Sequence, residues 1–598
     1  MQSCESFRRL HFLSTILFYL ALTLEEFVQN FSVNTKDITK QFEYFANFIV
    51  VANLYDANRF QIKDISTGKN APGIDGIAII INNRLCTSVE EVKDSIKYNN
   101  KLDVEFLFIQ SKISSKFEGN DIEGFFRWTK IFFNFEPNKV YTSELNNLIC
   151  IAKEVYKNSR YFSRYQPKLK LFYVCNGKWT EDVILKTIID ENIVELENKN
   201  LFESVEFIPY DVKKVQKMYL KTKLPVEASI IMENTIPLPK IDGVKSAMFT
   251  ILPFKEFVKL IVDDNDKIKS VFEDNIRGFL GLKDNTVNQD IQKTITEGRT
   301  GEFCLLNNGV TVVAEKIIGT GMDITLINYQ IVNGCQTSNV LYECRNESDI
   351  DKVYVPVKII ETDNNKIQVE VTRATNNQTE VETEQLEALT EYQKELEQYY
   401  EALAKKNANA LYYERRANQY KKDRINPANI VNIENQIKDF ASMFNEKPYI
   451  VSGYYSKLLK DLGKEIFNPQ HKPIMYYTSA LSYSKLMRFF NEEVIDNKLW
   501  RFRYHIIMIL KYVVNKKTVP QGNGKDIEKY CKSIIEILEN DEKCKIAFIE
   551  CQDFLLGLDN EIKISNRKSS EKRTTTEIIL KEIGYQYLGM PKQNTFHK

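Results

Sequence analysis

Three polar residues lie at the ends of two apolar, β-rich segments in the first fifth of the chain. Asp75 precedes the segment GIAIIINN, and Gln110 and Lys112 close the segment VEFLFIQSK. Side chains alternate between the two faces of a strand, so Gln110 and Lys112 share one face while Glu105 points to the other. Two neighbouring strands would therefore present an acid, an amide oxygen and a lysine to one point.

That combination of groups suits phosphodiester hydrolysis. The carboxylate of Asp75 and the amide oxygen of Gln110 are able to hold Mg²⁺, and the ammonium of Lys112 steadies the attacking water or the charge that develops at phosphorus. Polar residues at strand ends are also ordinary, and a lysine there is often only solvated. The spacing alone leaves both interpretations open.

A resemblance favours the catalytic interpretation. Asp75 followed by Gln110-x-Lys112 resembles the D…(E/Q)xK core of PD-(D/E)xK, restriction-endonuclease-like nucleases. It implies a mixed sheet flanked by helices, Mg²⁺ or Mn²⁺ as the cofactor, and DNA or RNA as the substrate. It also implies an acidic residue on a preceding helix, for which Glu43 in QFEYFANFIVV is the best placed candidate.

Two features of the sequence bear on this resemblance. Glu25 and Glu26 lie near Glu43 in the sequence and are alternative acids. Gln110 departs from the more common glutamate, and a neutral amide binds a divalent metal more weakly than a carboxylate does. A degenerate, inactive core is therefore the alternative to an active nuclease.

The composition is that of a globular protein without a global nucleic-acid-binding charge. Of 598 residues, 43% are hydrophobic and 27% charged, and Lys+Arg and Asp+Glu both total 81. Any basic surface must therefore be local. The ten cysteines form no CxxC pair, which argues against a zinc ribbon and against a disulfide framework in so long a chain. We therefore expect free thiols and a cytoplasmic location.

The N-terminal segment has the charge-then-apolar order of a secretory signal. Arg8 and Arg9 precede LHFLSTILFYLALT, but this run is short and interrupted by polar residues, and a helical pattern continues after it. We predict a buried N-terminal helix and no membrane segment.

Three domains are expected. Alternating strands and helices predict an α/β domain over 1–235, including a helix over 87–100 capped by Ser88. An α+β domain follows over 236–445, with β-rich stretches at 305–314 and 329–344. Residues 446–598 have mainly helical periodicity, and the polar run 563–577 is expected to be a solvated loop or linker.

Asn-Gly pairs mark the middle domain. Singly they predict tight turns, because Asn and Gly tolerate positive φ. Together, NIRGFLG, LNNGV, IVNGCQT and ATNNQ, followed by YERR at 413–416, resemble the signature of the AIPR, or abortive-infection phage-resistance, family. The resemblance covers roughly residues 240–440. The positions that match are Asn275, Arg277, Asn307, Asn308, Gly309, Asn333, Gly334, Gln336, Thr337, Asn376, Asn377 and Gln378.

Amide side chains both donate and accept hydrogen bonds, so this set is able to read bases, sugars or phosphates. Candidate nucleic-acid-binding residues are Arg277, Asn307, Asn308, Asn333, Gln336, Thr337, Asn376, Asn377, Arg415 and Arg416. The competing interpretation is a buried amide network that fixes loop geometry. For Arg415 and Arg416, a solvated helix face is favoured over a phosphate clamp.

The leading hypothesis is an antiphage, metal-dependent nuclease with Asp75, Gln110 and Glu43 at the metal and Lys112 at the water. The middle domain would bind nucleic acid, and the helical region would support a homo-oligomer or bind a partner. The rival hypothesis is a non-catalytic protein that binds nucleic acid or senses phage and retains a degenerate nuclease core.

Overall fold

The chain forms two compact units. Unit 1 consists of Met1–Thr222, Tyr392–Tyr413 and Ile425–Lys598, and unit 2 consists of Lys223–Glu391 and Glu414–Arg424. The computed structural model describes residues 23–590 apart from 32, 34, 56–59, 69–70, 72, 139–140, 163–165, 264–267, 270, 273–285, 365–366, 369, 372–373, 375–382, 408–409, 416–418, 421–424, 452–457, 459–460 and 567. Unit 1 thus contains both the N-terminal α/β part and the helical C-terminal region.

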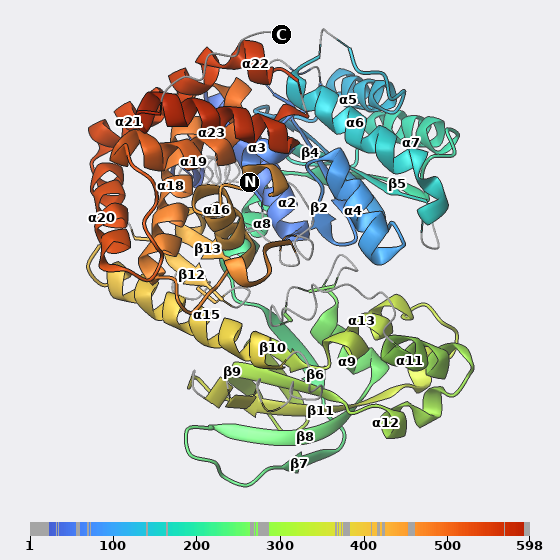
Figure 1. Cartoon of the computed structure of the whole chain (residues 1–598). Coiled ribbons are helices and arrows are strands. Elements are labelled where there is room, and N and C mark those ends of the chain that lie inside the picture. Colours follow the sequence, from blue (N-terminus) through green and yellow to red (C-terminus); the bar gives the residue numbers. More distant parts are fainter. Residues whose placement is uncertain are drawn as a thin grey trace, which may run out of the picture. The chain divides into compact units, whose positions relative to one another are not determined.

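Unit 1 contains a five-stranded mixed sheet with the order β2-β1-β3-β4-β5 (Figure 1). Its strands are β1 (Gly76–Ile81), β2 (Arg84–Leu85), β3 (Val104–Lys112), β4 (Lys168–Cys175) and β5 (Ser204–Tyr210). β1 is antiparallel to β2 and β3, whereas β3, β4 and β5 are parallel. The amino end of β1 therefore lies beside the carboxyl end of β3.

Helices cover both faces of this sheet. Leu107 and Ile109 of β3 pack with α2 (Ile38–Leu54) and α8 (Val212–Lys223) on one face. Phe106 and Phe108 pack on the other face, in one apolar core with residues of α4 (Val89–Asn99), α5 (Gly119–Phe132), α6 (Ser143–Lys157) and α7 (Val183–Glu197). The alternation along β3 produces two cores, one on each face.

One of these helices follows the sequence prediction closely. α4 begins at Ser88, which forms a reciprocal capping box with Glu91. The aromatic residues of α5 pack on the sheet, with the Phe132 ring 5.0 Å from that of Phe108. Of the predicted N-terminal helix, residues 23–30 are helical and residues 1–22 lie outside the described part.

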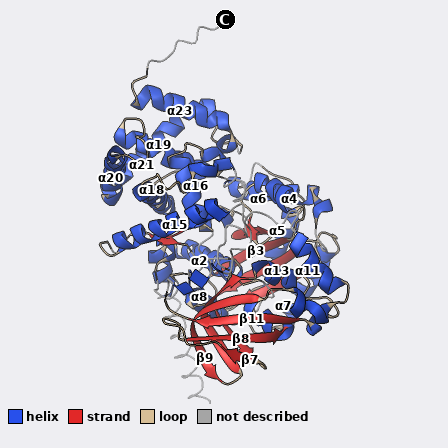
Figure 2. Ribbon diagram, turned by 60° about the horizontal axis from the view of Figure 1, so that its bottom comes forward, coloured by secondary structure: helices blue, strands red, loops and turns tan. Residues whose placement is uncertain are grey.

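The C-terminal region of unit 1 is helical, as Figure 2 shows. Its helices are α16 (Ile433–Met443), α18 (Pro473–Asn491), α19 (Arg503–Asn515), α20 (Lys525–Glu539), α21 (Asp541–Gly557), α22 (Asp559–Ile562) and α23 (Arg573–Tyr587). Residues Ile506 to Leu510 of α19 are all buried. α19 is therefore a central helix that other helices surround.

Unit 2 contains a six-stranded sheet with the order β6-β10-β9-β11-β8-β7. The strands are β6 (Glu227–Ile231), β7 (Thr235–Pro237), β8 (Ser246–Pro253), β9 (Val310–Thr320), β10 (Asp323–Asn333) and β11 (Tyr354–Glu361). Only β9 and β11 are parallel. The helices with the sheet are α9 (Phe254–Ile261), α11 (Thr286–Thr296), α12 (Phe303–Leu306) and α13 (Cys335–Glu343).

The remaining elements are α3 (Ile62–Ile65), α15 (Thr383–Ala404), and a small pair of strands, β12 (Tyr412–Glu414) and β13 (Ile430–Asn432). The predicted N-terminal mixed sheet flanked by helices, the sheet-containing middle region and the helical C-terminal region are thus confirmed. No helix in the described part of the chain combines the length and apolarity needed to cross a bilayer.

Two local predictions are wrong. The stretch 329–344 is not β-rich throughout, because β10 ends at Asn333 and α13 follows. The polar run 563–577 is not a solvated linker, since α23 begins at Arg573. Thr575 and Thr576 are buried there, and the Thr576 hydroxyl lies 3.1 Å from Nε2 of buried His505.

Candidate functional site

The antiparallel pairing of β1 with β3 brings Asp75 to Gln110. Gly76 is opposite Ile109, and the Asp75 N–H donates to the Ile109 carbonyl at 2.9 Å, which fixes the position of the aspartate at the strand end. Nε2 of Gln110 then donates to Oδ2 of Asp75 at 3.1 Å. The structure thus brings together the two residues that the sequence predicts as neighbours.

Ser111 completes the hydrogen bonds to Asp75. Its backbone N–H and its hydroxyl donate to the same Oδ2, at 2.7 and 2.8 Å. One carboxylate oxygen therefore accepts three hydrogen bonds, which fix the side chain and favour its charged form. Ser111 was missed by the sequence prediction because strand alternation turns it away from Gln110. Asp75 immediately precedes β1, and its carboxylate contacts both Gln110 and Ser111 near the carboxyl end of β3.

Amide oxygens without partners lie next to Asp75. Oε1 of Gln110 is buried and has no hydrogen-bond partner among the described residues, and the same is true of Oδ1 of Asn47 in α2. Nδ2 of Asn47 donates to the Asp75 carbonyl at 3.1 Å. A Cβ on Gly76 would lie 2.3 Å from the Asn47 Oδ1, so only glycine allows this approach. Buried acceptors without donors are costly, and a cation or water would satisfy them.

Lys112 lies at the same end of β3 and forms an ion pair with an acid that was not predicted. Its Nζ is 3.3 Å from Oδ1 of Asp121 in α5, and both side chains are partly exposed, at 40% and 37%. The sequence gives no signal for Asp121, because the pairing depends on how α5 packs on the sheet. Lys112 is therefore near the site but held by another carboxylate.

Burial raises the pKa of Asp75 above its ordinary value. The hydrogen bonds from Ser111 and the positive charges of Lys40 and Lys112 act in the opposite direction. The positive charge of Lys112 thus lowers the pKa of Asp75, although Lys112 forms its ion pair with Asp121. The aspartate is held in a poorly solvated place, where a bound cation would favour ionisation.

Glu43 lies on α2 and interacts with Asp75 through its charge. Burial and the negative charge of Asp75 together raise the pKa of Glu43 to about 7, although the charge of Lys40 and its hydrogen bond act in the opposite direction. The Lys40 ammonium forms an ion pair with the Glu43 carboxylate. Glu26, an alternative acid in the sequence, instead interacts with Tyr219 of α8.

These groups are able to bind a hard divalent ion through oxygen atoms. Nowhere in the described ranges do three His, Cys, Asp or Glu side chains cluster as metal ligands do. A Mg²⁺ or Mn²⁺ ion here would therefore use the carboxylates of Asp75 and Glu43 together with amide oxygens such as Oε1 of Gln110. Oxygen donors of this kind fit the preference of both ions.

The Asn-Gly motifs of unit 2 meet at one end of the β9–β10 pair. Asn333 is opposite Thr311, so the LNNG and VNGCQT motifs come together. Gly309 and Gly334 both have positive φ, and a Cβ on Gly334 would lie 3.0 Å from the Gly309 carbonyl oxygen. Asn308-Gly309 lies between α12 and β9, and Asn333-Gly334 lies between β10 and α13. Neither pair forms a hairpin turn.

The side chains of these motifs differ in exposure. Asn307 donates through Nδ2 to the Phe303 carbonyl at 3.0 Å, and Oδ1 of Asn333 accepts from the Gly334 N–H at 2.7 Å. Both therefore stabilise local backbone. Asn308 and Gln336 are exposed, and Thr337 is buried in the first turn of α13. Asn308 and Gln336 are thus the members able to meet a ligand.

Several predicted residues lie elsewhere. Arg277, Asn376, Asn377 and Arg416, with Asn275 and Gln378, fall outside the described residues. Arg415 is not on a solvated helix face as predicted. It follows strand β12 and is only 7% exposed. The error arises because Tyr412–Glu414 pairs with β13 as a strand, with Tyr413 buried against Tyr400.

Comparison with known proteins gives one match. The family model described as AIPR protein matches residues 272–547, slightly less than half of the chain. The match includes the Asn-Gly motifs of unit 2 and extends into the helical region of unit 1. No significant match was found among curated proteins or among solved structures.

Proposed function

We propose, from the premise that this chain is an AIPR family protein, that it is a metal-dependent nuclease that acts in abortive infection. Membership of the family implies a role in defence against phage. The nuclease activity rests on one observation, which is the cluster of Asp75, Gln110 and Lys112 at adjoining strand ends with a buried amide oxygen left without a donor. DNA or RNA would be the substrate, in the cytoplasm.

The carboxylates of Asp75 and Glu43 and Oε1 of Gln110 would hold Mg²⁺ or Mn²⁺. When bound, the ion supplies Lewis-acid activation of a phosphoryl oxygen and a water of lowered pKa. Lys112 exchanges its ion pair with Asp121 for the attacking water or a non-bridging phosphate oxygen. Ser111 keeps Asp75 oriented throughout. Attack of the water oxygen on phosphorus, in line with the scissile bond, would form one P–O bond and break the other, and the released sugar oxygen would take up a proton from solvent.

The test is cleavage of single- and double-stranded DNA and RNA by the purified full-length chain with Mg²⁺ or Mn²⁺. Lys112→Ala is expected to lower the rate at least about a hundredfold, since it removes a preorganised cation at the developing charge. Asp75→Asn should have a similar effect. Lys93→Ala is the matched control, because Lys93 pairs with Glu90 on an exposed helix face away from Asp75 and Gln110.

Thermal unfolding of each variant should match the wild type, which separates loss of catalysis from loss of the fold. Wild-type protein that cuts none of the four substrates with either metal would refute the nuclease assignment. A Lys112→Ala variant that cuts as fast as wild type would also refute it.

A second candidate function is a non-catalytic protein that binds nucleic acid or senses a phage component, in which unit 2 or a homo-oligomer performs recognition. The observation that favours it is that the polar groups of the site already interact with one another. Lys112 pairs with Asp121, and one Asp75 oxygen accepts three hydrogen bonds. Phage-protection assays distinguish the two. In this second function Lys112→Ala still protects cells, whereas changes at exposed Asn308 and Gln336 abolish protection.

A further inference from the structure

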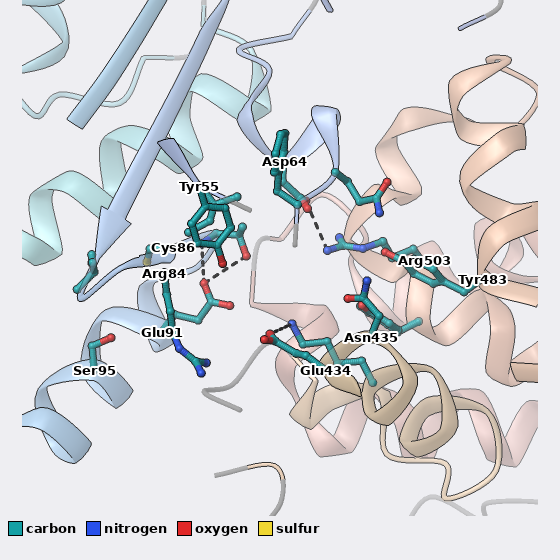
Figure 3. Close-up of a pocket in the computed structure, with 17 residues that line it drawn as sticks. Tyr55, Asp64, Arg84, Cys86, Glu91, Ser95, Glu434, Asn435, Tyr483 and Arg503 are labelled. Atoms are coloured by element: carbon teal, nitrogen blue, oxygen red, sulfur yellow. Dashed lines mark hydrogen bonds and ion pairs between the residues drawn. The ribbon is translucent and has the colours of Figure 1, made fainter. Parts of the chain in front are cut away.

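Unit 1 contains a cavity at the end of the sheet opposite to Asp75. Its volume is about 80 Å³, and it lies where β2 and α4 face α16, α18 and α19 (Figure 3). At roughly 10–15 Å³ for each water, several waters fit. The cavity can therefore hold a single planar ring. The rest of any larger ligand would lie outside the cavity.

Two of the cationic groups around the cavity are already neutralised. Arg503 lies 3.5 Å from Asp64, which also accepts a hydrogen bond from Nε1 of Trp500 at 3.0 Å. Lys438 lies 2.8 Å from Glu434. A polyanion such as a triphosphate would have to compete with these carboxylates, so the cavity does not favour a ligand of high negative charge.

Glu91 presents an acceptor to this space. Oε2 accepts hydrogen bonds from the backbone N–H groups of Thr87 and Ser88, at 2.5 and 3.2 Å, and thereby caps α4. No described residue donates to Oε1, and Figure 3 shows the carboxylate directed toward the open space. Burial raises the pKa of Glu91 to about 7, so a ligand that donates a hydrogen bond here would relieve the cost of burying its charge.

An amide and aromatic rings supply the remaining recognition groups. The side chain of Asn435 lines the cavity and makes no hydrogen bond to the described residues. It can donate and accept at once. Tyr483 and Tyr504 also line the cavity, and their rings are stacked with centroids 5.2 Å apart. A flat ring with donors and acceptors on its edge matches this lining. An aliphatic zwitterion matches it less well, because its carboxylate would have to compete for Lys438 and Arg503, which already pair with carboxylates.

We propose that this cavity binds a single-ring nucleobase with an exocyclic amino group, that is cytosine, whose amino group donates to Oε1 of Glu91. The NH₂ group of Asn435 donates to the neighbouring ring nitrogen and carbonyl oxygen, which are both acceptors. The base is either that of a free nucleoside or an unpaired base of a single strand, because both present the same edge. The binding does not depend on nuclease activity.

Isothermal titration of the full-length protein in EDTA tests this with cytidine and uridine, which have the same size but a donor or an acceptor at the same position. Cytidine should bind at least about tenfold more tightly than uridine. Glu91→Gln should remove or reverse this preference, because the glutamine oxygen replaces the cap acceptor and its NH₂ group then faces the cavity. Glu90→Gln is the control, since Glu90 is on the same helix but pairs with Lys93 and does not line the cavity.

Further outcomes of the same titrations decide the proposal. A cytidine trinucleotide that binds more tightly than cytidine, with the same dependence on Glu91, supports a strand as the source, and equal binding supports the free nucleoside. Saturable binding of neither ligand overturns the proposal, as does unchanged binding in Glu91→Gln. Adenosine bound more tightly than cytidine would overturn the restriction to a single ring.

Discussion

At the scale of single residues, Asp75 and Glu43 are two partly buried acids whose charges repel. Burial raises the pKa of both, and that of Glu43 reaches about 7 from an ordinary value of 4.5. Between these two values the folded protein holds a proton that the unfolded chain has already released. Stability therefore falls as pH rises through this window.

Glu43→Gln removes this titration. We expect the wild type to lose stability relative to the variant as pH is raised from about 4.5 to about 7, with little further change above pH 7. Chemical denaturation at several pH values in EDTA measures the difference. A constant difference across this range would contradict the raised pKa. Added Mg²⁺ should stabilise the wild type more than the variant at pH 8, because the ion offsets the repulsion between the two acids.

The meeting of Asp75 with Gln110 was predictable because strand alternation and strand ends follow from the pattern of apolar residues. The roles of Ser111, Asn47 and Asp121 were not. Each depends on a contact across the sheet edge or from a helix far away in sequence, and no local pattern encodes such a contact. The family motifs identified the positions in unit 2 but not their exposure.

At the scale of elements, Gly334 determines how β10 passes into α13. Its φ is +91°, and a Cβ there would lie 2.7 Å from Cγ2 of Val310 and 3.0 Å from the Gly309 carbonyl oxygen. Both the backbone conformation and the close approach therefore require glycine.

Gly334→Ala should destabilise unit 2 by about 1–3 kcal/mol, from strain in the left-handed region and from the displaced strand β9. Gly301→Ala is a matched control in the same unit, because a Cβ there meets nothing within 4 Å and its φ is not positive. Denaturation followed by circular dichroism measures both. Equal stability of the two variants would show that the connection tolerates a side chain.

Strands were predicted best where a long apolar segment was present, as in β1 and β3. The prediction failed at 563–577, because only the fold shows that threonines of a polar run are buried against His505. It failed at 329–344 because a short apolar run suits a strand and a helix equally. Tertiary packing decides such segments.

At the scale of the whole molecule, unit 1 joins the N-terminal α/β part of the chain to the C-terminal helical region. Nζ of Lys63 in α3 donates to the Phe490 carbonyl and to Asn497, both at 2.6 Å, and Asp64 pairs with Arg503 of α19. The mainly buried ion pair links the α/β part to the helical region, since both side chains are less than 20% exposed.

A double-mutant cycle with Asp64→Asn and Arg503→Met tests this link. Each single change should destabilise unit 1, and the double variant should be more stable than the sum predicts, by about 1–3 kcal/mol. The exposed pair Arg573 and Glu577 is the control, and it should show much weaker coupling. Additive effects at Asp64 and Arg503 would mean that the pair contributes nothing to joining the two parts.

The composition of unit 1 has a consequence for biosynthesis. Glu91 leaves the ribosome long before Lys438, by roughly half a minute at about 10 residues per second. During that interval unit 2 is synthesised, and the α/β part of unit 1 still lacks the C-terminal helical region that completes the cavity. The cytosine cavity closes only when translation is nearly finished, so a truncated product would lack it even if its strands had paired. Incomplete copies that end before α16 would therefore be unable to bind the base at this site.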